Sequence, residues 1–288
     1  MSDQDSFQRF IFEEIGVRGE LVRLDQSWHS VLDRHPYPAN VGSQLGQALA
    51  AVVLLSATIK FKGSLILQAQ SEGPLHTLVA QATHQRVIRG LAQWHHEVPH
   101  GTLAEIYGPG RLALTIQNEG AEPYQGIVAL EGSNLAEALQ TYFTRSEQLA
   151  TRLWLVADGD RAAGLLLQEL PERHGERDDW DRVTLLADTL TEKELLRLPG
   201  EELLYRLFNE ERVRLFEPEP VTFRCACSRE RIENLLRSLG RDEVESILKE
   251  KELVEVTCEF CNRRYVFDAV DAHALFESAS LTGPRTRH

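Results

Sequence analysis

The chain lacks most of the features that define secreted and membrane proteins. Its 288 residues include only four cysteines, all in the last quarter of the chain, which argues against a secreted scaffold stapled by disulfides. The most apolar run, from Ala48 to Leu55, is far too short to cross a bilayer. The acidic N-terminus has no basic segment followed by an apolar one, so the sequence predicts no signal peptide. We therefore expect a cytoplasmic protein that does not use a membrane.

Positive charge is also scarce. The chain has 31 Lys and Arg residues against 44 Asp and Glu residues, a net charge of −13, so the phosphates of a nucleic acid would be repelled. It contains no G-x-x-x-x-G-K-S/T, G-x-S-x-G or H-E-x-x-H motif. His95, His96 and His100 lie close together, but no Cys or acidic ligand has a matching spacing, which favours a polar loop. We expect no nucleotide, no nucleic acid and no enzymatic activity.

The four cysteines themselves form two close pairs. Cys225 and Cys227 are spaced C-x-C, Cys258 and Cys261 are spaced C-x-x-C, and 30 residues separate the pairs. Two such pairs around one small structural unit can place four sulfurs at the corners of a tetrahedron, which is the geometry that Zn²⁺ prefers. Asn262 follows the second pair and tolerates the left-handed backbone that such a turn often needs. The spacing predicts one zinc ion per chain.

The C-x-C spacing leaves two interpretations open. A disulfide across so short a loop is strained and easily reduced, which favours a redox switch. The alternative is a plain four-cysteine zinc site that only holds a small domain together. Arg224, Arg229, Arg231, Arg263 and Arg264 lie near the cysteines in sequence, and cations there would offset the charge of a zinc–thiolate centre.

The first 171 residues mix helix and strand patterns. Apolar residues recur at helical spacing from Val41 to Ile59 and predict a long buried helix. Residues 112–117 and 124–130 resemble a hairpin, and Ser133 or Asn134 is expected to begin a helix that continues to Leu149. The segment from Phe7 to Ile15 fits a helix or a helix–strand junction. Because helices and strands do not alternate regularly, we predict an α+β core domain over residues 1–171.

Composition changes after Pro171. The 50 residues from Pro171 to Pro220 hold 14 acidic and 8 basic residues. Helical patterns persist, and Thr191 and Glu194 form a predicted capping box. We interpret residues 172–220 as a helical linker of low stability that docks on a partner surface, although an ordinary solvated connector fits the same composition. Residues 221–288 form the third predicted domain, with Ser228 and Asp242 as expected helix caps and a tail from Ser280 to His288.

Several sequence motifs together are typical of one family. They are Phe223-x-Cys225-x-Cys227 followed by Ser228–Arg231, Cys258-x-x-Cys261 followed by Tyr265 and Phe267, and residues 17–20, 124–128 and 142–149. These motifs resemble the 33 kDa chaperonin family, the redox-regulated holdase chaperones of bacteria. The resemblance implies that oxidation forms Cys225–Cys227 and Cys258–Cys261 disulfides, releases Zn²⁺, and unfolds the C-terminal domain and linker. It further implies capture of unfolded client proteins without ATP, and a homodimer in the active state.

The residues themselves are also compatible with two other functions. A thiol–disulfide oxidoreductase could use Cys258 and Cys261, but the motif would then need to begin a helix in a thioredoxin-like context. A constitutive zinc adaptor could bind a basic partner through its acidic surface.

Overall fold

The computed structural model describes residues 5–170 and 177–277. The chain divides into two compact units, Met1–Arg224 and Cys225–His288. The residues predicted as a linker therefore pack as part of the first unit, whereas the second unit contains all four cysteines.

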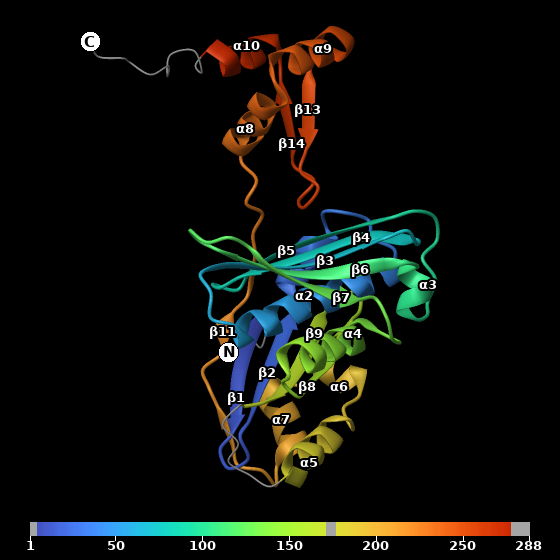
Figure 1. The fold of residues 1–288 in the computed structure, drawn as a ribbon, viewed down its shortest axis with the longest axis vertical. Coiled ribbons are helices and arrows are strands. Elements are labelled where there is room, and N and C mark those ends of the chain that lie inside the picture. Colours follow the sequence, from blue (N-terminus) through green and yellow to red (C-terminus); the bar gives the residue numbers. More distant parts are fainter. Residues whose placement is uncertain (1–4, 171–176, 278–288) are drawn as a thin grey trace, which may run out of the picture. The chain divides into compact units, whose positions relative to one another are not determined.

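Two six-stranded sheets make up most of the first unit (Figure 1). The first has the order β10-β1-β2-β9-β8, with β11 also paired to β1, and the second has the order β12-β5-β4-β3-β6-β7. Their neighbours are antiparallel except for β12 and β5, which are parallel. The strands of the first sheet are β1 (Ser6–Phe12), β2 (Val17–Leu24), β8 (Thr151–Ala157), β9 (Ala162–Glu169), β10 (Val213–Leu215) and β11 (Glu219–Pro220). Those of the second are β3 (Gly63–Ser71), β4 (Leu75–Thr83), β5 (Val87–Trp94), β6 (Gly110–Asn118), β7 (Tyr124–Ala129) and β12 (Thr222–Phe223).

The long helix α2 (Ala39–Thr58) lies between the two sheets and contacts strands of both (Figure 1). Its residues are buried on nearly every side, and this confirms the helix predicted from apolar spacing. A Cβ at Gly46 would lie 2.5 Å from the Cβ of Ala157, so glycine permits the close approach to β8. Among the described residues, α2 alone is long and apolar enough to cross a membrane, and here it is the core helix.

The remaining segments of the first unit confirm some predictions and correct others. The predicted hairpin is present as β6 and β7, and Asn134 caps α4 (Leu135–Tyr142) by accepting from Glu137 N–H. The helix does not continue to Leu149 in α form, because the turn after Tyr142 is the π-helical η1 (Phe143–Glu147). The segment from Phe7 is the strand β1. The short helices α1 (Gln26–Leu32) and α3 (Leu103–Tyr107) complete this part.

Three helices cover the face of the first sheet that points away from α2 (Figure 1). They are α5 (Arg177–Ala187), α6 (Glu192–Arg197) and α7 (Gly200–Phe208). Their apolar side chains form a second core with alternate residues of β1, β2 and β9. The predicted capping box of Thr191 and Glu194 is present at α6. These helices are amphipathic, as the sequence indicated, and their partner surface is this sheet face.

The second unit is a small α+β module. It contains α8 (Arg229–Leu239), α9 (Arg241–Lys251), the hairpin β13 (Val254–Thr257) and β14 (Arg264–Phe267), and α10 (Ala269–Glu277). Ser228 caps α8 as predicted. The prediction that Asp242 caps α9 is wrong, because α9 begins at Arg241 directly after Gly240 and Asp242 lies inside its first turn. The predicted tail, Ser280–His288, lies outside the described residues.

Candidate metal centre

The four predicted cysteines come together in the second unit. Their Sγ atoms all lie within 4.8 Å of one another. The closest pairs are Cys225 with Cys258 at 3.6 Å and Cys227 with Cys261 at 3.3 Å. A tetrahedral zinc site with Zn–S bonds of about 2.3 Å has sulfurs about 3.8 Å apart. The cluster therefore matches the size of a four-thiolate zinc centre.

Two local structures position the sulfurs. Cys225 and Cys227 lie in an irregular segment that ends where Ser228 caps α8. Cys258 and Cys261 lie in the turn between β13 and β14, where Asn262 N–H donates to Cys258 O at 2.8 Å and Cys258 N–H donates to Arg263 O at 2.9 Å. Asn262 has φ = +56°. This confirms the left-handed turn predicted at that residue, and it folds the C-x-x-C pair back on itself.

The electrostatic environment differs from one sulfur to the next. Burial raises the pKa of Cys261 to about 12 and also raises the pKa of Cys225. Burial acts in the same direction on Cys227, but hydrogen bonds from the Tyr265 hydroxyl and the neighbouring thiols outweigh it and lower the pKa of Cys227 to about 7. Such close thiols titrate as a set. The hydrogen bonds around Cys227 therefore favour ionisation of the cluster, and that ionisation belongs to the four thiols together.

Tyr265 is the functional neighbour that sequence reasoning missed. Its hydroxyl lies 3.2 Å from Cys227 Sγ and donates to it. A hydrogen bond to a thiolate stabilises the ionised form, which is the form that binds a metal. The only sequence signal was the position of Tyr265 four residues after Cys261, and that spacing does not reveal which sulfur the hydroxyl reaches.

Three of the arginines that lie near the cysteines in sequence have partners that show whether they face the sulfurs. Arg229 binds Asp271 at 2.8 Å, and Arg264 pairs with Glu255, so both are engaged away from the sulfurs. Arg263 interacts with Tyr265, and this hydrogen bond together with the charges of Cys227 and Cys261 raises the pKa of Arg263. Arg263 is therefore a cation that the described structure ties to the cluster.

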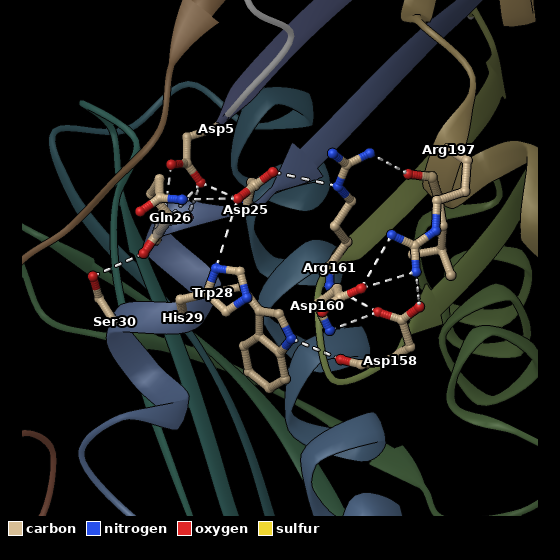
Figure 2. Close-up of polar contacts among 12 residues, drawn as sticks. Asp5, Asp25, Gln26, Trp28, His29, Ser30, Asp158, Asp160, Arg161 and Arg197 are labelled. Carbon is tan, nitrogen blue, oxygen red and sulfur yellow. Dashed lines mark hydrogen bonds and ion pairs between the residues drawn. The ribbon is translucent and has the colours of Figure 1, made fainter.

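A second polar cluster joins the end of α6 to the turn between β8 and β9 (Figure 2). Arg197 of α6 donates to Asp158 at 2.7 Å and to Asp160 at 3.3 Å, and Arg161 donates to Leu196 O at 3.2 Å. The Asp158 carboxylate also accepts from the backbone N–H groups of Asp160 and Arg161, both at 2.8 Å, and so closes the β8–β9 turn. We call the four residues Asp158, Asp160, Arg161 and Arg197 the turn latch.

The fold and the sulfur cluster together define a class of protein: a large two-sheet unit followed by a small module in which four clustered thiols could hold a metal ion. The chain belongs to the Hsp33 family, because the family model described as Hsp33 protein matches residues 5–268. The family resemblance and the mixed α+β fold inferred from the sequence are thereby confirmed.

Relatives and a solved structure support this assignment. The 33 kDa chaperonin of Nitrosococcus oceani is 68% identical, with all of both chains covered. The 33 kDa chaperonin of Pseudomonas paraeruginosa is 49% identical, again over all of both chains. The crystal structure of the 33 kDa chaperonin (heat shock protein 33 homolog) from Thermotoga maritima matches with a TM-score of 0.84 at 25% identity, covering 96% of this chain and 99% of that one. The chain is thus a member of a chaperone family.

Proposed function

We propose that this chain is a redox-regulated, ATP-independent holdase. Reduced, it would hold one Zn²⁺ on Cys225, Cys227, Cys258 and Cys261 and remain inactive. Oxidation would release the ion, unfold the second unit and free the linker, so that apolar surface binds unfolding proteins during oxidative stress in the cytoplasm. In this proposal residues 1–171 bind clients and dimerise, residues 172–220 are the linker, and residues 221–288 are the switch.

The observation that carries the proposal is the concentration of four clustered sulfurs in a unit with a very small core. The apolar core of the second unit consists of Ile232, Leu236, Val244, Val254, Tyr265, Phe267, Ala272 and Leu275, with a few partly buried neighbours. So small a core stabilises a fold weakly. Zinc, when bound, supplies four further bonds that join α8 to the β13–β14 hairpin. Loss of those bonds is therefore expected to unfold the module.

The proposed oxidation step removes two electrons from each pair of zinc-bound thiolates. Hydrogen peroxide accepts these electrons, and solvent supplies the protons: two thiolates, one peroxide and two protons give one disulfide and two waters, and the released Zn²⁺ passes to solvent. The family resemblance supplies the pairing Cys225–Cys227 and Cys258–Cys261, and the short spacings allow it. All pairs of sulfurs in the cluster are within 4.8 Å, so each of these disulfides needs only local movement.

The surface that the linker covers explains how unfolding would create a binding site. Alternate residues of β1, β2 and β9 present Phe10, Phe12, Leu21, Leu165 and Leu167 to α5, α6 and α7, and all five are buried. Removal of these helices would expose a contiguous apolar face. Faces of this kind bind other proteins.

The position of the C-x-x-C pair disfavours the oxidoreductase alternative. Cys258 and Cys261 lie in a hairpin turn between β13 and β14, whereas a thioredoxin-like motif begins a helix, whose N-terminus stabilises the thiolate. No comparable observation favours a constitutive zinc adaptor.

One experiment tests the proposal against both alternatives. The zinc-loaded protein is treated with peroxide at mildly raised temperature, zinc release is followed with a chelating dye, and client aggregation is followed by light scattering. We expect release and suppression together. A variant with Cys258→Ser and Cys261→Ser is the matched control and should lose the peroxide dependence. Retained zinc with no suppression would contradict the proposal, and disulfide turnover at trace protein would favour the oxidoreductase.

A further inference from the structure

One short stretch of the first unit closes an edge of each sheet. Residues 213–224, which we call the edge strap, contain β10, β11 and β12. β10 and β11 pair with β1, the edge strand of the first sheet, and β12 pairs with β5, the edge strand of the second (Figure 1). The residue after the strap is Cys225, the first cysteine of the metal centre. The strap is therefore the covalent link between the sheet edges and the switch.

The contacts of the strap with β5 are few. Thr222 N–H donates to Arg86 O and Arg224 N–H donates to Ile88 O, both at 3.1 Å. β12 has two residues whereas β5 has eight, and in the described part of the chain no other strand pairs with that edge of β5. Parallel pairing is also slightly weaker per residue than antiparallel pairing. β12, the last strand of the strap, can therefore leave the edge of β5 without breaking the rest of the second sheet.

The side chains of the strap show what kind of segment fits this edge. Val221 is 1% exposed and belongs to the main core, Thr222 is exposed, and Phe223 is partly buried against the same core. The fitting segment is extended and places apolar side chains at alternate positions. Stretches of this pattern occur in nearly every unfolded protein, because they are the buried strands of folded ones.

A charge contact holds the strap in place. Glu219 lies 2.9 Å from Arg9 and 3.5 Å from Arg86. Arg86 is buried, donates to Ser56 of α2 at 2.8 Å, and stacks 4.1 Å from the centre of the Phe7 ring. Removing Glu219 would leave a buried cation with one fewer partner. In the reduced protein these contacts therefore favour the strap in its paired position. We expect the strap to be displaced only when another part of the chain changes, such as when the second unit unfolds.

We propose that the edge strap is displaced when the second unit unfolds, and that the β5 edge which it uncovers pairs with extended, alternately apolar segments of unfolded client proteins. This inference rests on the proposed holdase function and names a binding site for it. The client would add a strand to the sheet through backbone hydrogen bonds, and its apolar side chains would occupy the positions left by Val221 and Phe223. Backbone pairing is independent of client sequence, which suits a chaperone with many clients.

Hydrogen exchange with mass spectrometry tests the site directly. In the oxidised protein we expect the amides of Thr222 and Arg224, which donate to Arg86 O and Ile88 O in the described structure, to exchange at least tenfold faster than in the reduced protein. We expect amides of β5 to gain protection when a chemically unfolded client is added. The edge strand β7, at the other end of the same sheet, is the internal control and should not respond to the client. Capture of the client without protection of β5 would overturn the inference and leave the holdase function standing. Failure to capture any client would overturn both.

A proline variant tests displacement without oxidation. Thr222→Pro removes the N–H that donates to Arg86 O, whereas Thr222→Val keeps it and serves as the matched control. We expect the reduced, zinc-loaded Thr222→Pro protein to show faster exchange at the Arg224 amide, which donates to Ile88 O, and measurable client capture at unchanged zinc content. Faster exchange at Arg224 without capture would overturn the inference. Concentration-dependent dimers that protect β5 in the absence of client would assign the edge to a second copy of the chain instead, and would also overturn it.

Discussion

Phe208 of α7 offers the sharpest test of how the linker is restrained. Its side chain is 2% exposed and its ring packs against Phe12 at 5.0 Å, edge to face, and against Phe10 at 6.2 Å. Replacing a buried phenylalanine with alanine costs about 3–5 kcal/mol. Since about 1.4 kcal/mol is a factor of ten, Phe208→Ala should shift the docking equilibrium of α7 by roughly two to nearly four powers of ten.

Hydrogen exchange of α5–α7 in the reduced protein measures this shift, with zinc content and client capture recorded on the same samples. The matched control is Tyr205→Ala on the same helix, because Tyr205 is 74% exposed and its removal should change exchange little. We expect faster exchange and partial client capture for Phe208→Ala only. Unchanged exchange would refute the packing argument. Faster exchange with no capture would show that the linker is not the restraint.

Three further predictions concern single residues. Burial raises the pKa of Glu20 to about 7. Between about pH 4.5 and 7 the folded state therefore holds a proton that the unfolded state has released. Over this range the free energy of unfolding should fall with rising pH, by on the order of 3 kcal/mol. Urea titrations followed by tryptophan fluorescence should show this slope, and Glu20→Gln should flatten it. Gly19→Ala would drive a Cβ into the Phe10 ring and should cost about 1–3 kcal/mol, read as a lower urea midpoint. Asn262→Val places a β-branched residue at φ = +56° at a cost of about 1–2 kcal/mol, so chelator competition should show roughly five- to thirtyfold weaker zinc binding, with Asn262→Gly close to the parent.

The sequence predicted helices and strands correctly where the apolar residues of a segment follow a single helical or strand period. The 20-residue helix α2 was found because its apolar residues follow helical spacing over several turns. β1 was left undecided for a physical reason: Phe7 faces the main core, whereas Phe10 and Phe12 face the core under the linker helices. A strand with apolar residues on both faces loses the alternation that identifies strands. β12 was missed because two residues carry no period at all.

For the candidate metal centre, the sequence predicted the four cysteines and the left-handed turn at Asn262, but not the contacts that other side chains make with the sulfurs. Cysteine spacing indicated which residues gather, because two short loops can each offer two thiols. The contact from Tyr265 to Cys227 spans 38 residues and depends on how the β13–β14 hairpin meets the segment before α8. The turn latch was not predictable for the same reason, because Asp158 and its partner Arg197 lie 39 residues apart.

The burial of α2 between two sheets has a consequence for synthesis. Its last residue is Thr58, but β8, the first of the two later strands that cover it on one side, begins only at Thr151. The ribosome must therefore add roughly ninety residues while this apolar helix lacks that cover, which takes about 5 to 20 seconds at ordinary elongation rates. For that interval the nascent chain exposes an apolar surface of the kind that binds other proteins and aggregates.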